Sequence, residues 1–442
     1  MHVAVIGTGI AGLSAAWLLD PHHRLTVYEA LPRAGGHSHT IDARFGDRTV
    51  PVDTGFIVYN ERNYPNLKNL FQTLDVPTAE SNMSFGVSQD EGRFEYASTA
   101  WASLFAQRRR LADPRHWRLL TDIVRFNAAA RRFLDGADDD RPLGDWLATR
   151  RFDGALAKRY VLPMAAAIWS APLEAVRAFS ARSFLTFFRN HGLLTITDQP
   201  RWRTVVGGSR TYVTTILSRL RAEIRRATPV GSVRRTADGV AVTDSMGNER
   251  CFDAVILATH ADQSREILAD RDTDEADVLA GFPFQTNEAI LHSDPALMPR
   301  RRRAWASWNF MTGASTDPQM PVSLTYWMNL LQNIDEATPL FVSLNPLREP
   351  DPDLVHARMS YAHPMFDTAT VQNQQRLASI QGRGGVWHAG AWCGYGFHED
   401  GLTAAMRVCE AGFGIRAPWL APATMPASGP ALMVEAAAAK AV

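Results

Sequence analysis

The sequence has few cysteines, few lysines and no long apolar run. Its three cysteines, Cys251, Cys393 and Cys409, lie far apart and form no CxxC or Cys/His pattern. This spacing argues against a disulfide framework and against a structural zinc site, so we expect no metal. No stretch approaches the roughly 20 apolar residues of a membrane-spanning helix, and the mean hydropathy is −0.18. The chain opens on a strand-like segment without a secretion-signal pattern, so we expect a soluble cytoplasmic protein.

The sequence also lacks an excess of charge of either sign. Its 46 basic and 46 acidic side chains balance, whereas a nucleic-acid-binding domain carries a net positive surface. We therefore expect no nucleic-acid partner. Hydrophobic residues make up 46% of the 442 positions, which is enough for a sizeable core. The length predicts two or three structural units.

A glycine-rich turn between a predicted strand and a predicted helix is the clearest motif. Val3–Ile6 is a short apolar run, Leu13–Leu19 favours a helix, and Leu25–Glu29 reads as a second strand. The intervening turn, Gly7-Thr8-Gly9-Ile10-Ala11-Gly12, fits GxGxxG. In this context the three glycines permit a tight turn, close approach to a pyrophosphate and close helix–strand packing.

Glu29 ends the second strand at the position that contacts a ribose in dinucleotide-binding folds. Its carboxylate can accept hydrogen bonds from both ribose hydroxyls and would repel the 2′-phosphate of NADP. The free N–H groups at the start of the helix would then face the phosphates. The residues of this unit alone leave two alternatives open, namely NAD as the dinucleotide or a glycine turn with a solvated Glu29.

The α/β elements are separated along the chain. Strand patterns return at Gly231–Val242 and at Asp253–Thr259, and a last strand-to-helix unit covers Val386–Trp392 and Leu402–Ala411. We therefore predict an α/β fold with a discontinuous Rossmann-like domain formed by residues 1–80, 200–270 and 370–420. An inserted α+β substrate domain covers 81–199, which is mainly helical, and 271–369, which contains an antiparallel sheet. Residues 421–442 form a tail.

One strand of the inserted sheet has a clear apolar alternation. From Val322 to Met328 apolar side chains alternate with Ser323, Thr325, Trp327 and Asn329. The pattern predicts a strand with one buried face.

Several motifs resemble those of the superfamily that contains flavin amine oxidases, protoporphyrinogen oxidase and phytoene desaturase. They are Arg33-Ala34-Gly35-Gly36, Val205–Ser209, Thr228-Pro229-Val230, Asp253–Thr259, Gly390-Ala391-Trp392 and Glu399–Ala405. They occur in order over about nine-tenths of the chain, and the resemblance implies that the cofactor is FAD rather than NAD. The Rossmann-like domain is then an FAD-binding domain.

The resemblance also implies which residues bind the cofactor. They are Gly7, Gly9, Ile10, Ala11, Gly12, Glu29, Ala30, Arg33, Gly35, Gly36, His37, Asp53, Thr54, Gly55, Val230, Ala258, Thr259, Gly390, Asp400, Gly401, Leu402 and Thr403. The helix after Gly401 would direct its N-terminus at the flavin pyrimidine and stabilise negative charge there. An Asx-type turn is the alternative for Asp53, and simple packing is the alternative for His37 and His39.

Within the superfamily, the nearest resemblance is to predicted bacterial FAD-dependent oxidoreductases associated with cyclopropane-fatty-acid-synthase-like methyltransferases. It rests on Gly35–Thr40, Val52–Asn60, Leu162–Ser170 and Tyr361–Asp367. It implies a lipid or fatty-acyl substrate that gives a hydride to flavin N5, and a methyltransferase partner. The chain has no second GxGxxG after a strand, so we expect electrons to come from the organic substrate rather than from NAD(P)H.

The sequence departs from the amine oxidase pattern at two places. Amine oxidases of the superfamily usually carry a substrate-domain lysine near N5, but the only lysines here are Lys68, Lys158 and Lys440. An aromatic cage position is occupied by His398, which we take as the candidate catalytic residue because an imidazole can bind or transfer a proton. Amine oxidation remains one alternative function. A non-catalytic, flavin-bound partner of a lipid methyltransferase is another.

Arginines are concentrated between Arg108 and Arg132, where eight of them accompany only Asp113 and Asp122. Aromatic and apolar residues lie between them. The pattern is typical of solvated helix faces over a buried stripe. The alternative hypothesis is a peripheral surface for anionic lipid headgroups.

Overall fold

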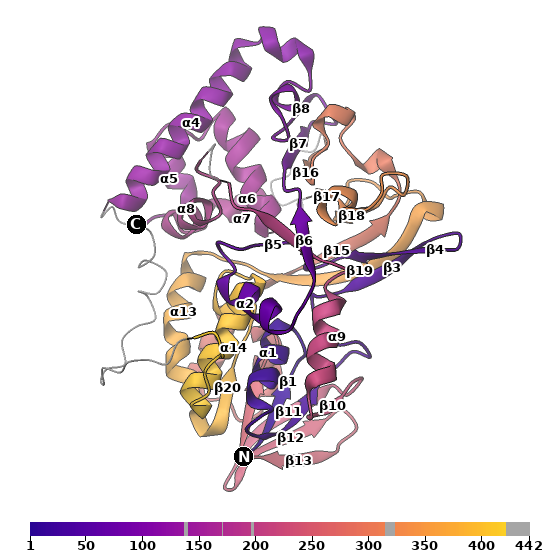
Figure 1. Cartoon of the computed structure of the whole chain (residues 1–442). Helices are drawn as coiled ribbons and strands as arrows, with labels where there is room; N and C mark the ends of the chain where they lie inside the picture. Colours follow the sequence, from indigo (N-terminus) through magenta and orange to yellow (C-terminus); the bar gives the residue numbers. More distant parts are fainter. Residues whose placement is uncertain (137–139, 170, 196–198, 314–322, 421–442) are drawn as a thin grey trace.

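The computed structural model describes residues 1–136, 140–169, 171–195, 199–313 and 323–420, so the predicted tail lies outside the described residues. In Figure 1 a parallel sheet with its helices forms the lower half, and a larger sheet with a group of helices forms the upper half. This agrees with the predicted α/β fold class, including the second part that contains antiparallel strands.

The lower half is built on a five-stranded parallel sheet in the order β10–β2–β1–β14–β20. Its strands are β1 (His2–Ile6), β2 (Arg24–Tyr28), β10 (Glu223–Arg225), β14 (Ala254–Leu257) and β20 (Val386–His388). Val3 and Val5 pack in a cluster with helices α1 (Ile10–Leu19) and α14 (His398–Phe413). Ala4 and Ile6 pack instead against the strands on the other face. Burial on both faces explains why β1 is apolar throughout.

A three-stranded antiparallel sheet covers that second face. It consists of β11 (Val230–Thr236), β12 (Gly239–Asp244) and β13 (Glu249–Phe252). Val233, Val240 and Val242 contribute to its apolar contact with the parallel sheet. The lower half therefore has three layers, with the carboxyl ends of β1 and β2 leading into the cavity described below.

The upper half contains a seven-stranded sheet in the order β19–β15–β18–β17–β16–β7–β8. The strands are β7 (Phe85–Gln89), β8 (Phe94–Ala97), β15 (Phe284–His292), β16 (Trp308–Met311), β17 (Ser323–Trp327), β18 (Phe341–Leu344) and β19 (Val355–Pro364). All neighbours pair antiparallel except β16 and β7, which run parallel.

This sheet differs from the sequence expectations in two details. The segment expected to be mainly helical begins with the β7–β8 hairpin, whose turn places Asp90, Glu91 and Gly92 at positive φ. β17 is buried along its whole length rather than on one face, because it is an inner strand and both its faces are covered. Val322, at the start of that pattern, lies outside the described residues.

Helices cover one side of the upper sheet, as expected for most of the segment 81–199. They are α3 (Trp101–Leu104), α4 (Pro114–Asp135), α5 (Leu143–Thr149), α6 (Leu162–Trp169), α7 (Leu173–Arg177) and α8 (Ala181–Asn190). Asp113 starts α4 by accepting a hydrogen bond from the Arg115 backbone N–H, with Pro114 in the first turn.

The chain forms further strands and α-helices. They are β3 (Thr40–Phe45), β4 (Arg48–Asp53), β5 (Tyr59–Asn60), α2 (Pro65–Thr73), β6 (Thr78–Ser81), β9 (Trp202–Val205), α9 (Arg210–Arg219), α10 (Ala261–Ile267), α11 (Thr273–Ala280), α12 (Met328–Leu331) and α13 (Thr368–Ile380). None of the helices in the described ranges combines the length and the apolar character needed to span a bilayer.

Candidate active site

A cavity of about 2140 Å³ extends from the glycine-rich turn into the upper half of the molecule. A site for one drug-sized ligand occupies roughly 300–1,000 Å³, so this cavity has room for a dinucleotide and a substrate together. The predicted residues that line it are Gly7, Gly9, Ile10, Ala11, Glu29, Ala30, Arg33, Gly36, His37, Thr54, Gly55, Val230, Ala258, Thr259, Gly390 and His398. Seven predicted residues do not line it: Gly12, Gly35, Asp53, Asp400, Gly401, Leu402 and Thr403.

The start of α1 offers a site for phosphates. Gly9 is the N-cap residue and makes no side-chain cap, and the first amide to find a helical partner is that of Leu13, which donates to the Gly9 carbonyl at 2.9 Å. The preceding amides are therefore free for a ligand. A Cβ added at Gly9 would meet no atom within 4 Å. An uncapped helix N-terminus beside open space fits a pyrophosphate.

Gly7 and Gly12 have the turn and packing roles expected of the motif, whereas Gly12 and Gly35 do not line the cavity. Gly7 has φ 101° and donates its N–H to the Tyr28 carbonyl at 2.8 Å. A Cβ at Gly12 would overlap the Gly7 carbonyl, so Gly12 serves helix–strand packing rather than the cavity surface. Gly35 has φ 115°, a left-handed conformation that allows the chain to turn just before Gly36.

Glu29 is buried at the adenosine end of the cavity. Its carboxylate accepts hydrogen bonds from the Thr8 N–H at 3.1 Å and the Leu31 N–H at 2.9 Å, and also binds the Thr8 hydroxyl. A carboxylate offers about four acceptor positions, so one remains for a ribose hydroxyl. The geometry therefore leaves room for a hydrogen bond from one ribose hydroxyl rather than from both, as the sequence had indicated.

Asp53 does not line the cavity but forms hydrogen bonds between separate segments of the chain. Its carboxylate accepts hydrogen bonds from the Ser209 N–H and hydroxyl at 2.8 and 2.7 Å and from the Thr40 hydroxyl at 2.6 Å. Burial raises the pKa of Asp53 to about 6. Asp53 thus joins the end of β4 to the start of α9, which fixes the loop whose next two residues do line the cavity.

The helix of the last motif begins earlier than the sequence indicated. Phe397 is its N-cap, and the Asp400 carboxylate accepts the Phe397 N–H at 2.9 Å. The amides of Leu402 and Thr403 therefore lie inside α14, where they bond to carbonyls four residues earlier. A Cβ at Gly401 would come within 2.8 Å of the Ile10 side chain, so this glycine allows α14 to approach α1. The cavity is lined by Gly396, Phe397 and His398 instead.

Two acidic side chains at the start of α14 have roles that the sequence reading missed. Glu399 accepts the backbone N–H groups of Asn66 and Leu67 at 3.0 and 2.9 Å and so caps α2. Burial raises the pKa of Asp400 to about 7 and also raises the pKa of Glu399. The only sequence signal is two acidic residues at the start of a helix, which is compatible with a cap but does not identify its partner.

His398 is held as a neutral ring. Its Nε2 lies 2.9 Å from the Ser38 hydroxyl, and its ring stacks on Phe56 with centroids 3.7 Å apart. Burial lowers its pKa to about 3. A side chain that stays neutral to such a low pH takes up no proton near neutrality, so this geometry favours a wall of the site over proton transfer.

Tyr361 from β19 connects the polar groups at the junction of the two halves. Its hydroxyl lies 2.7 Å from Thr54 Oγ1 and 2.9 Å from His39 Nδ1. His37 and His363 line the cavity beside it, with ring centroids 5.6 Å apart. Burial lowers the pKa of His39 and of His363 to about 4 and that of His37 well below its usual value. These imidazoles give a polar but uncharged junction.

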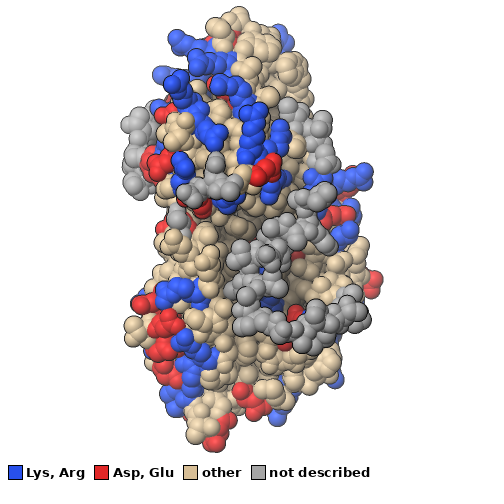
Figure 2. Space-filling view, turned by 90° about the vertical axis from the view of Figure 1, so that its left-hand side faces the viewer, with Lys and Arg blue, Asp and Glu red and all other residues tan. Residues whose placement is uncertain are grey.

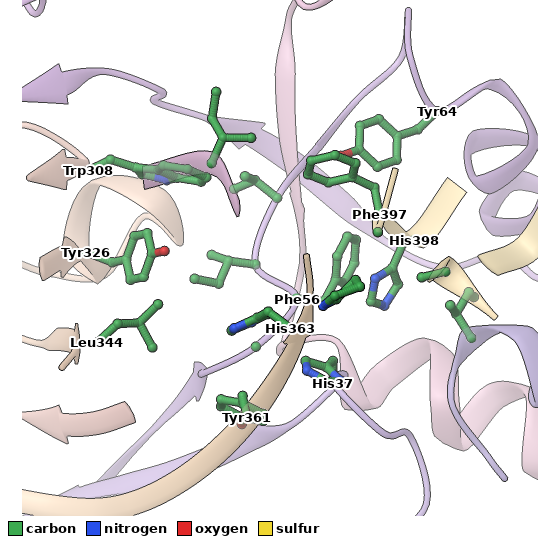
Figure 3. Close-up of a pocket in the computed structure, with 18 of the residues that line it drawn as sticks. His37, Phe56, Tyr64, Trp308, Tyr326, Leu344, Tyr361, His363, Phe397 and His398 are labelled. Atoms are coloured by element: carbon green, nitrogen blue, oxygen red, sulfur yellow. The ribbon is translucent and has the colours of Figure 1, made fainter. Parts of the chain in front are cut away.

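Beyond this junction the cavity becomes an apolar arm. Trp308, Tyr326 and Leu344 come from three neighbouring strands and form one wall in Figure 3. Other residues that line the arm are Met83, Phe85, Leu104, Leu120, Ile123, Tyr160, Met164, Ile168 and Phe187. Sequence reasoning did not find this set, because its members come from distant strands and helices and only the sheet order brings them together.

Neither described lysine lines the cavity. Lys68 lies 3.3 Å from Glu61 in an ion pair at the surface, and Lys158 belongs to the helical turn before α6. The described residues likewise contain no cluster of His, Cys, Asp and Glu suited to a metal ion.

Comparison with known families identifies the class of protein. Residues 10–296 match the family of flavin-containing amine oxidoreductases, which is more than half of the chain. The chain belongs to this family. It is a flavin-dependent oxidoreductase whose cofactor is FAD, and the uncapped start of α1 and the acidic Glu29 fit the two ends of the cofactor's AMP half.

Solved structures with the same fold have diverse activities. A fatty acid isomerase from P. acnes that produces CLA is 13% identical, with a TM-score of 0.64 over 93% of this chain and 98% of that one. A putative protoporphyrinogen oxidase from Exiguobacterium sp. 255-15 is 16% identical at TM-score 0.64 with the same coverage. Cyclohexylamine oxidase from Brevibacterium oxydans IH-35A is 14% identical at TM-score 0.67, again with that coverage.

Proposed function

We propose that the protein oxidises an apolar, lipid or fatty-acyl substrate by transfer of a hydride to FAD. The observation that carries this proposal is the apolar arm, which leads from the junction at His37 and Tyr361 to the surface helices. The fatty acid isomerase fold neighbour adds support, because its name concerns an acyl substrate.

The residues of the chain position the reactants. FAD, when bound, supplies the hydride acceptor at N5. The start of α1 and Glu29 hold its AMP half, and the loop of Thr54 and Gly55 lies at the junction of the cavity. The walls of the arm exclude water and hold an alkyl chain so that one C–H bond meets the acceptor. Loss of a hydride and a proton would oxidise the substrate by two electrons, the proton would pass to solvent, and an external oxidant such as oxygen, a quinone or a carrier protein would take up the two electrons.

Amine oxidation is the second candidate. Cyclohexylamine oxidase shares the fold, and Tyr64 and Phe397 place two aromatic rings beside the junction, where a cation can lie against them. Against it, neither described lysine lines the cavity, and the junction carries neutral histidines rather than a carboxylate.

Anaerobic reduction of the bound flavin separates the two candidates. The purified protein is mixed without oxygen with fatty acids, lipid extracts, amines or NAD(P)H, and flavin absorbance is followed. The proposal predicts bleaching by an acyl lipid and none by amines or NAD(P)H. Bleaching by amines alone would replace it with amine oxidation.

A variant that blocks the apolar arm tests whether the substrate uses it, and its FAD content is the internal control. Leu344→Trp fills the arm far from the cofactor-binding turn, so we expect FAD to remain bound while lipid-driven bleaching slows at least tenfold. Unchanged bleaching in this variant would show that the substrate does not use the arm.

A further inference from the structure

The outer end of the apolar arm opens between α3 and α4. Trp101, Trp117 and Val124 line the cavity there and are also 66%, 41% and 54% exposed. Leu111, between the two helices, is 53% exposed. Four of the most exposed large apolar side chains in the described part of the chain therefore lie within one short stretch, three of them at the mouth of the cavity and Leu111 bonded through its carbonyl to Trp117.

A second, basic cavity lies next to this mouth. It has a volume of about 360 Å³ and is lined by Ala106, Gln107, Arg108, Arg109, Arg301 and Arg303. Arg301 forms an ion pair with the buried Glu95 at 2.7 Å. Within the described ranges, Arg108, Arg109 and Arg303 form no ion pair with an acidic side chain, so their charges are available to an anion.

The side of the molecule that carries α4 is also basic. Figure 2, in which the side that carries α4 and α5 faces the viewer, shows Lys and Arg side chains gathered over the upper part of the molecule with few acidic ones between them. On α4, Arg118 and Arg125 both pair with the single carboxylate of Asp122. These three side chains therefore carry a net charge of about +1.

We propose that this docking face, defined by Trp101, Leu111, Trp117, Val124, Arg108, Arg109 and Arg303, binds the surface of an anionic lipid bilayer. The arginines of the basic cavity hold phosphate headgroups, and the tryptophans and aliphatic side chains enter the headgroup–acyl boundary. A lipid chain then passes from the bilayer into the arm without crossing water.

A bilayer fits both features better than a soluble anion does. A free phosphate would use the arginines but would leave the exposed apolar side chains without a partner. Tryptophan is suited to the membrane interface because its ring is apolar and its N–H is polar. The Trp117 N–H donates to the Leu111 carbonyl at 2.9 Å, and this hydrogen bond keeps the Trp117 ring beside Leu111. Charge and apolar surface therefore point to the same occupant.

Co-sedimentation with vesicles tests the proposal. The FAD-bound protein is mixed with vesicles of equimolar phosphatidylcholine and phosphatidylglycerol or with vesicles of phosphatidylcholine alone. We expect binding to the anionic vesicles only, weakening as salt rises. Equal binding to both vesicles, or none to either, would overturn the proposal.

Variants locate the binding to the docking face. Arg108→Ala with Arg303→Ala should weaken vesicle binding about thirtyfold, since each basic residue near an anionic surface contributes about fivefold. Trp101→Ser should weaken it at high salt as well, because its contribution is apolar. Arg48→Ala with Arg265→Ala, two exposed arginines elsewhere, is the control and should change little. Unchanged binding in both docking-face variants would also overturn the proposal.

Competition with inorganic phosphate distinguishes a lipid headgroup from a free phosphate as the bound anion. Inorganic phosphate should displace the protein no better than chloride of equal ionic strength, and full displacement by phosphate alone would assign the basic cavity to a free phosphate instead. The proposal deepens the proposed function, because the docking face supplies the arm with substrate. Vesicle binding is measured without turnover, so its failure and a failure of lipid-driven flavin reduction are separate results.

Discussion

The imidazole of His398 lies on the ring of Phe56, with centroids 3.7 Å and planes 18° apart. The pair joins the first turn of α14 to the loop after β4, so two segments from opposite ends of the chain form one wall of the site. Ser38 lies within hydrogen-bond distance of both His398 and Tyr212 and completes this wall.

We predict that His398→Phe retains FAD and activity. A phenyl ring keeps the stack on Phe56, and the Ser38 hydroxyl still has Tyr212 as a partner, so the loss of stability should be about 1 kcal/mol. Flavin content, thermal unfolding and the rate of flavin reduction check this. If the variant keeps its FAD but loses flavin reduction a hundredfold, His398 takes part in proton transfer after all.

The buried histidines predict that the protein loses stability in mild acid. Burial lowers the pKa of five histidines to about 4 and that of a sixth, His398, to about 3. Four of the five are deeply buried, namely His191, His292, His363 and His388, and the fifth, His39, is half-buried. In the unfolded chain they take up protons near pH 6.5, so the unfolded state binds more protons between pH 6.5 and 4, and stability falls as the pH falls through this window. Each group contributes up to about 1.4 kcal/mol per pH unit.

Two buried carboxylates act in the opposite direction. The pKa values of Asp53 and Asp400 are raised to about 6 and about 7, so the stability they contribute is fully present below their unfolded pKa and is lost as the pH rises to 7. The six histidines outweigh the two carboxylates. The midpoint of thermal unfolding should therefore be lower at pH 5 than at pH 7, and an equal or higher midpoint at pH 5 would contradict the burial of these histidines.

Asn127 on α4 is predicted to contact a polar group of the substrate. It is 5% exposed and lines the apolar arm, and its Oδ1 has no hydrogen-bond partner among the described residues. Asn127→Leu removes the unsatisfied buried Oδ1, so stability should rise by about 1 kcal/mol or stay constant. The KM for the lipid substrate should rise about tenfold with kcat little changed. A loss of stability without any change in KM would show that the amide has a structural partner instead.

The glycine turn and Glu29 could be placed together at one end of the cavity from the sequence, because their signal is local. Gly7, Gly9 and Glu29 act within one strand–turn–helix–strand unit, where spacing determines geometry. The family motifs likewise identified the loop of Thr54 and Gly55, which lines the cavity.

The rest depended on contacts between distant segments. Asp53 was assigned to the cofactor, but its partners Ser209 and Thr40 are known only once α9 and β3 are placed. The sequence placed the start of α14 too late, because the helix begins where the Asp400 carboxylate accepts the Phe397 N–H. This side-chain cap is not visible in helix propensity alone. The apolar arm has no sequence motif, since its walls come from several separate strands and helices.

FAD binding by a Gly9→Val variant tests the central claim most directly. Gly9 has φ −64° and ψ −179°, which valine tolerates, and a Cβ there meets only open cavity. Gly154→Val is the control, since a Cβ at Gly154 also meets nothing within 4 Å and this glycine lies on the surface outside the cavity. The wild-type protein and Gly154→Val should become yellow with FAD, whereas Gly9→Val should unfold at the same temperature as the wild-type apoprotein but remain colourless. A Gly9→Val protein that binds FAD as tightly as the wild type would contradict the placement of the cofactor at the start of α1.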